Sequence, residues 1–177
     1  MIAALFVTAA AAFQPAPCAV QDVPSDFEQQ HRVECGWVSV PLAPGRNAVL
    51  RLWTARIGAS GPTKRPDPVL FINGGPGIAT IDSVLPGLPE SKALQALLAD
   101  RDLILFDQRG SGRSEITLCP ALARTLADIS AADLPPGTED VRTRDAFVGC
   151  RAEIERAGVD LSAYSTSATV SDIEHLR

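Results

Sequence analysis

The sequence predicts an α/β fold built around parallel strands. Two apolar runs, 68–72 (PVLFI) and the start of 102–110 (DLILFDQRG), are typical of strands buried on both faces of a sheet. Between them, 91–99 (SKALQALLA) has leucines at helical spacing, and Ser91 is placed to cap its first turn. A strand, a helix and a second strand in this order predict a βαβ unit with its two strands parallel.

The segments before this unit predict two further strands. Residues 19–34 are polar and are expected to be irregular. Residues 36–42 (GWVSVPL) alternate as a short strand does, and 48–57 (AVLRLWTARI) read as a longer one. The composition of 58–67 (GASGPTKRPD) predicts a loop that leads into the βαβ unit.

The C-terminal third predicts helices. Residues 119–138 are mixed, with a short helical stretch. A helix is expected over 138–158, capped by Thr138 and stopped by Gly158. A last helix is expected to begin near Thr166.

Composition and charge exclude some function classes. The chain of 177 residues is 46% hydrophobic and 21% charged, as in an ordinary globular domain. Its net charge is −5 and it contains no run of Lys or Arg, which argues against a nucleic-acid partner.

The N-terminus predicts export. Residues 2–13 form a twelve-residue apolar run, which is too short for a stable membrane-spanning helix. It suits the core of a secretory signal, with Ala10 and Ala12 as cleavage points, although no Lys or Arg precedes it. We expect 1–17 to be a secretory leader and the protein to be secreted or periplasmic. The alternative is a frayed apolar N-terminus in a cytosolic protein.

The cysteines predict disulfides rather than a metal site. No C-x-x-C pair occurs and the two histidines are isolated, so the spacing of zinc ligands is absent. In an exported protein, two disulfides are the natural interpretation. Three pairings are possible, and four buried free thiols are the alternative. The simplest pairing joins sequence neighbours, Cys18–Cys35 and Cys119–Cys150.

Two loops carry the candidate chemistry. The first follows 68–72 and consists of Asn73, Gly74, Gly75, Pro76 and Gly77. Glycines let a backbone turn its N–H groups inward, and proline stiffens the turn. Such a loop suits the oxyanion of an acyl-transfer reaction, although a plain turn is the alternative. The second loop, 107–114 (DQRGSGRS), leaves the next parallel strand at the same edge of the sheet.

Together these loops resemble the proline-iminopeptidase-like branch of the α/β-hydrolases. That family pairs G-G-P-G after its third strand with D-Q-R-G-x-G-x-S after its fourth, and both motifs occur here in order. The segment ECGWVSVPL resembles the entry strand of secreted tripeptidyl-aminopeptidase-like members, and STSATVSDIEHLR resembles the helix that leads into their nucleophile. Two departures are Asn73, where His is usual, and the IAT that follows the first motif.

The resemblance covers nearly all of residues 18–177. It implies that they are the N-terminal part of an α/β-hydrolase fold, a mostly parallel sheet with flanking helices, ending before the nucleophile elbow. Gly75 would supply the oxyanion-hole N–H. The rest of that loop would be shaped by Asn73, Gly74, Pro76 and Gly77. The second loop would support the site through Asp107, Gln108, Arg109, Gly110 and Gly112. The alternative for Asp107 and Arg109 is a surface ion pair.

The nucleophile is missing from these 177 residues. No G-x-S-x-G occurs, and Ser111 and Ser114 lack the flanking glycines of that motif. Asp172 and His175 share one helix face and are interpreted as surface residues. We therefore expect the chain to supply no nucleophile, acid or base, to need no cofactor or metal, and to be inactive alone. A cap or insertion is expected to start at about 119–158.

The function that the resemblance implies is an exported serine hydrolase. It would be an aminopeptidase that cleaves short N-terminal units from peptides through Ser-His-Asp chemistry. The ligand would be a peptide or a small acyl substrate. Alternatives are an esterase or epoxide-hydrolase-like enzyme on the same fold, or a non-catalytic exported binding module.

Overall fold

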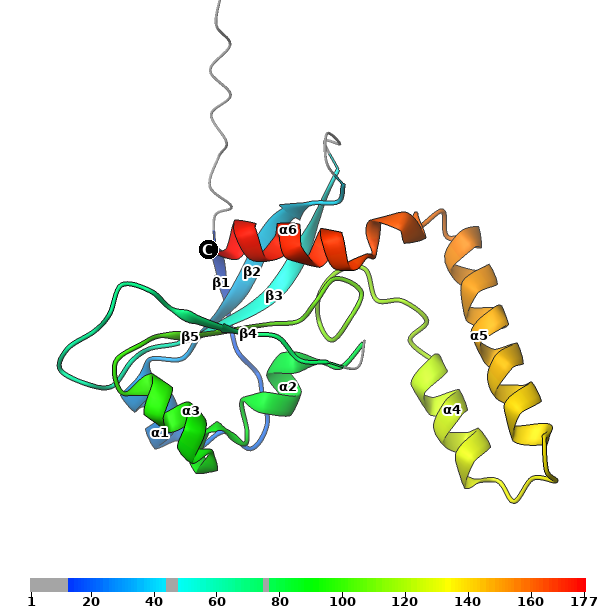
Figure 1. Ribbon diagram of the computed structural model, residues 1–177, viewed down its shortest axis with the longest axis horizontal. Coiled ribbons are helices and arrows are strands. Elements are labelled where there is room, and N and C mark those ends of the chain that lie inside the picture. The colour runs from blue at the N-terminus through cyan, green and yellow to red at the C-terminus, as the bar shows by residue number, and fades with distance from the viewer. Residues whose placement is uncertain (1–12, 44–47, 75–76) are drawn as a thin grey trace, which may run out of the picture. The chain divides into compact units, whose positions relative to one another are not determined.

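The computed structural model describes residues 13–43, 48–74 and 77–177, which form two compact units (Figure 1). The first unit comprises the chain up to Ile116 together with Thr166–Arg177. The second unit is Thr117–Ser165. The predictions for residues 1–12 and for Gly75 and Pro76 concern positions outside the described residues.

The first unit contains a five-stranded mixed sheet. Its strands are β1 (Phe13–Ala16), β2 (Glu34–Pro41), β3 (Val49–Ile57), β4 (Val69–Phe71) and β5 (Leu103–Phe106), in the spatial order β1-β2-β3-β5-β4. β4 and β5 are parallel, whereas the other neighbouring strands are antiparallel. A short loop joins β2 to β3, which forces them to be antiparallel, and a helical crossover joins β4 to β5. The α/β class is confirmed, and the sheet of this chain is mixed rather than mostly parallel.

Helices cover both faces of this sheet (Figure 1). The helical elements of the first unit are α1 (Ser25–His31), α2 (Thr80–Val84), a 3₁₀ turn η1 (Leu88–Glu90), α3 (Lys92–Leu98) and α6 (Thr166–Leu176). α1, α2 and α3 pack on the face that carries Trp53, Ala55 and Leu105. α6 packs on the face that carries Leu50, Leu52 and Phe106, through Ile173 and Leu176. Successive side chains of β3 point to opposite faces of the sheet, so they contribute alternately to the two hydrophobic cores.

Several predicted elements are confirmed. The strands at 36–42 and 48–57, the parallel pair and the helices at 91–99 and near Thr166 are present. Ser91 caps α3, because its Oγ accepts the Leu94 N–H at 3.4 Å.

Two predictions were wrong in detail, those for residues 19–34 and for the burial of β4. Residues 19–34 contain the helix α1, which buries Phe27 and His31 one turn apart. Residues 13–16, which fall within the predicted leader 1–17, form β1 and pair with β2. β4 is half-buried rather than buried on both faces, because it is short and has one neighbouring strand among the described residues.

The second unit is a helical hairpin. It contains α4 (Leu122–Ala131), α5 (Thr138–Arg156) and a short 3₁₀ turn η2 (Leu161–Ala163). Gly158 ends α5 with a φ of +71°, as predicted. Thr138 is the first helical residue and not the cap; that position is taken by Gly137, whose φ of +79° disfavours other residues.

Both predicted disulfides are present. Cys18–Cys35 lies in the first unit and joins the segment after β1 to β2, and Cys119–Cys150 joins α5 to the segment before α4 in the second unit. Within the described ranges, no helix has the length and apolar character needed to cross a membrane.

Candidate functional site

The two motif loops leave the same edge of the sheet. β4 and β5 run parallel, and Phe71 pairs with Leu105 near their carboxyl ends. The loops 72–79 and 107–114 therefore start side by side, where open α/β sheets bind ligands.

Asp107 joins the two loops from inside the protein. Its side chain is fully buried just after β5. Its Oδ1 accepts the N–H of Ile81 in α2 at 3.0 Å, and its Oδ2 accepts the N–H of Arg113 at 2.9 Å. Burial raises the pKa of the Asp107 carboxyl above its usual range, while the N–H groups of Arg113 and Ile81 oppose this shift. The carboxylate thereby connects α2, which follows the first loop, to the second loop.

A second connection runs directly between the loops. Gln108 Nε2 donates to the carbonyl oxygen of Asn73 at 2.8 Å. The Asn73 side chain is engaged within its own loop, because its Oδ1 accepts the Gly74 N–H at 2.9 Å. Around Gly74 and Gly77 there is open space where a Cβ would stand, and Gly77 has a φ of +96°. The described part of the first loop is thus held at Asn73 and open beyond it.

The tight turn of the second loop depends on glycine. Gly110 and Gly112 have φ values of +75° and +53°, a region that other residues avoid. At Gly112 a Cβ would also overlap the Asp107 carboxylate. The close approach of the backbone to Asp107 explains the glycine at this position.

Arg109 is buried and is paired with α6. Its Nε and one terminal nitrogen donate to the two carboxylate oxygens of Asp172 at 2.8 and 2.6 Å. The two side chains are 3% and 1% exposed. The guanidinium also donates to the carbonyl oxygens of Leu42 and Pro41 at 2.9 and 3.3 Å. Arg109 thus connects the second loop to the end of β2 and to α6.

This arrangement corrects two interpretations. Asp107 and Arg109 do not form a surface ion pair, because both are buried and each has its own partners. Asp172 is not a surface residue, because it lies on the face of α6 that packs on the sheet. His175 is exposed, and its Nδ1 lies 2.7 Å from the Ser171 carbonyl oxygen.

The serines of the second loop serve the backbone. Ser114 Oγ donates to the Asp107 carbonyl oxygen at 2.6 Å and accepts the Trp53 N–H at 2.8 Å. Ser111 Oγ donates to the Gln108 carbonyl oxygen at 2.8 Å. Both hydroxyls therefore shape the loop through hydrogen bonds to its backbone.

Comparison with known proteins relates this chain to peptidases. It is 28% identical over 166 residues to proteins named tripeptidyl aminopeptidase from Streptomyces coelicolor and from Streptomyces lividans. The chain is similar to peptidases over most of its length. The match covers 89% of this chain but 30% of each relative. No protein-family model matches the chain.

Sequence reasoning assigned no role to Arg113 and interpreted Asp172 as a surface residue. The burial of Asp172 was indicated by its position, because it lies on the same side of α6 as the apolar residues Ile173 and Leu176. Arg113 occupies a variable position of the motif and gave no signal. In the part of the chain that the structure describes, no three His, Cys, Asp or Glu side chains converge as metal ligands do.

A cavity of about 500 Å³ lies at the opposite end of the parallel strands. Its lining includes Pro68 before β4, Asp102 before β5, and the cations of Arg56 and Lys64. Both cations pair with the Asp102 carboxylate, at 2.7 and 2.6 Å. Asp102 thus pairs with two of the cations that line this cavity at the amino ends of the strands. The candidate site remains at their carboxyl ends.

Asp102 is expected to contribute stability that acid removes. Burial disfavours its charge, but Lys64, the Ala59 N–H and Arg56 outweigh this and lower its pKa from 3.8 to about 2. A depressed pKa gives stability that is present above about pH 4 and lost as the pH falls toward 2. A shift of this size is worth at most about 2.6 kcal/mol, and the half-exposed cations reduce it through solvent screening.

Urea denaturation of the full-length protein at pH 6 and pH 3 measures this contribution. Asp102→Asn is expected to lower the free energy of unfolding at pH 6 and to reduce its loss on acidification. An equal acid dependence in both proteins would contradict the assignment. Asp67→Asn, at an exposed acid paired with Arg101, is the matched control.

Proposed function

We propose that this chain is the N-terminal part of an exported serine peptidase of the α/β-hydrolase class. In this proposal the whole protein is an aminopeptidase that cleaves short N-terminal units from peptides. The observation that carries it is the joining of the two motif loops at the carboxyl end of the parallel pair by Asp107 and Gln108. The similarity to tripeptidyl aminopeptidases supports the substrate class.

The proposed task of this chain is to stabilise negative charge. When a serine attacks a peptide carbonyl, the carbonyl oxygen becomes an oxyanion that needs fixed hydrogen-bond donors. The backbone N–H of Gly75 is the proposed donor, in a loop whose neighbours Asn73 and α2 are held by Gln108 and Asp107. Donors held in place before the reaction cost no reorganisation in the transition state. The nucleophile, the acid and the base are proposed to lie in the remaining sequence of the whole protein.

Export is the second part of the proposal. Two disulfides persist in oxidising compartments and are rare in the cytosol. They support a secreted or periplasmic location, as does the apolar run at 2–13. The second unit, Thr117–Ser165, is proposed to begin a cap or insertion.

The kinetics of two loop variants test the oxyanion assignment in the full-length protein. Gly75→Ala places a methyl group where the substrate carbonyl would approach and is expected to lower kcat on a tripeptide arylamide at least about tenfold, or about 1.4 kcal/mol. Asn73→Ala removes an Oδ1 that caps Gly74 within the loop and is expected to cost less. Both variants are compared at matched folded fractions.

Three outcomes would count against this proposal. Full activity of Gly75→Ala, with Asn73→Ala inactive, would show that Gly75 is not the oxyanion donor. Hydrolysis of aryl esters without cleavage of peptide arylamides would favour the esterase alternative, and no hydrolysis of either would favour the binding module.

A further inference from the structure

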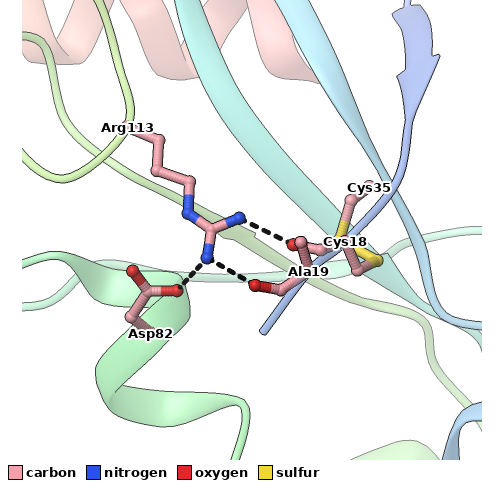
Figure 2. The surroundings of a disulfide bond; sticks show 5 residues. All are labelled: Cys18, Ala19, Cys35, Asp82 and Arg113. Atoms are coloured by element: carbon pink, nitrogen blue, oxygen red, sulfur yellow. Dashed lines mark hydrogen bonds and ion pairs between the residues drawn. A yellow bond between two sulfur atoms is a disulfide. The ribbon is translucent and has the colours of Figure 1, made fainter. Parts of the chain in front are cut away.

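Arg113 connects three segments that are far apart in the sequence (Figure 2). One terminal nitrogen donates to the Cys18 carbonyl oxygen at 2.7 Å. The other donates to the Ala19 carbonyl oxygen at 2.9 Å and to Asp82 Oδ1 in α2 at 2.8 Å. The guanidinium also lies 5.6 Å from the centroid of the Trp53 ring, within the range of a cation–π contact.

The segment that receives Arg113 is itself fixed. Cys18 is bonded to Cys35 in β2, so its carbonyl belongs to a position anchored to the sheet. Ala19 has a φ of +45°, a left-handed backbone that turns the chain at this point. The disulfide and this turn present two successive carbonyl oxygens to one guanidinium, as Figure 2 shows.

Arg113 also binds two acids that meet at the first turn of α2. Asp107 binds the Ile81 N–H, and Asp82 is the next residue along the chain. The charge of Asp82 raises the pKa of Asp107, though less than burial does and against the N–H bonds that Asp107 accepts. The Arg113 side chain binds Asp82 while its backbone N–H binds Asp107. One residue thus neutralises the exposed acid and orients the buried one.

We propose that Arg113 is a positioning residue that holds the first turn of α2 against the segment anchored by Cys18–Cys35. Because α2 directly follows the first motif loop, this contact sets where that loop ends. The role rests on the proposed function, and it gives the N-terminal disulfide a part in activity without contact with substrate. Arginine suits this role, because its guanidinium presents donors on two terminal nitrogens, whereas a lysine ammonium has a single nitrogen.

The test uses the full-length protein and two readouts. Arg113→Met keeps the length of the side chain and removes its charge and donors. It is expected to speed amide hydrogen exchange in 80–85 at least about fivefold and to lower kcat on a tripeptide arylamide about tenfold, with KM within about twofold. Arg113→Lys is expected to restore part of kcat. Arg101→Met is the matched control, since Arg101 is similarly exposed and pairs with acids away from α2.

The disulfide provides a second, independent arm. Cys18→Ala/Cys35→Ala is expected to give the same faster exchange in 80–85. Adding Arg113→Met to it is expected to give little further change, because the two act through one contact. Fully additive effects on exchange would overturn the proposal.

The remaining outcomes separate this inference from the proposed function. Unchanged exchange in Arg113→Met overturns the positioning role. Faster exchange with unchanged kcat per folded molecule also overturns it, while a peptide-cleaving wild-type protein keeps the proposed function. A wild-type protein that cleaves no peptide arylamide removes the proposed function, and with it the role of Arg113 in activity.

Discussion

Replacing Asp172 with alanine is expected to lower the free energy of unfolding by about 3–5 kcal/mol, because it leaves the buried Arg109 guanidinium without its carboxylate. The two side chains are almost fully buried and share two hydrogen bonds of 2.8 Å or less. A buried charge that loses its partner pays its full desolvation cost. Chemical denaturation of the full-length protein measures this loss, with Tm as a second measure.

Two further variants make that result specific. Glu174→Ala changes an exposed acid on the same helix that pairs with Arg177 at 3.2 Å, and it is expected to cost less than about 0.5 kcal/mol. Arg109→Met/Asp172→Leu replaces the pair with apolar side chains and is expected to recover most of the loss. If Asp172→Ala lowers the free energy of unfolding no more than Glu174→Ala does, the buried pair does not stabilise the fold.

Removing the disulfide of the second unit is the other change with a large expected effect. Cys119→Ala/Cys150→Ala is expected to lower the local stability of Thr117–Ser165 by roughly 3–4 kcal/mol in the chain-entropy model. This unit buries few apolar side chains of its own; among the described residues they are Cys119, Ile129, Ile154 and Ala163. A small core of this kind depends on covalent links.

Limited proteolysis reports this loss directly. The double variant is expected to be cut within 117–165 at protease concentrations that leave the wild-type protein intact, and the amides of α5 are expected to exchange faster. Val148→Ala changes an exposed apolar residue of α5 and is expected to behave as wild type. Equal cleavage of the double variant and the wild-type protein would show that helix packing alone holds the hairpin.

Periodicity predicted the fold where apolar residues repeat over a sufficient length. β2, β3 and α6 carry such repeats, and Ser91 supplies a cap for α3, so their places were predictable. α1 is seven residues long and buries two side chains, which is too little for a period to emerge. β1 begins at the last residue of the apolar run 2–13, whose composition equally suits a leader, and its pairing with β2 depends on contacts distant in the sequence.

The candidate site was predictable as two loops but not as a network. Glycine spacing indicated the turns at Gly110 and Gly112, and the order of strands placed both loops at one edge. The partners of Asp107 and Arg109 come from α2 and α6, and a single sequence does not show which distant group satisfies a buried charge. The alternative interpretation, a surface ion pair of Asp107 with Arg109, fails for this reason, because the fold gives each its own partners.

The edge strand β1 determines whether the backbone of β2 is covered at this side of the sheet. β1 pairs with Cys35–Val38 of β2, and it contains Pro15, a residue that sheets accept at edges. Processing that leaves Phe13 in place keeps β2 covered. A cut after Pro17 would instead expose a row of unpaired backbone groups on β2, which is a template for strand addition between molecules. Under the proposal that a leader is removed, the position of the cut would decide whether this sheet edge stays covered or can pair with a second molecule.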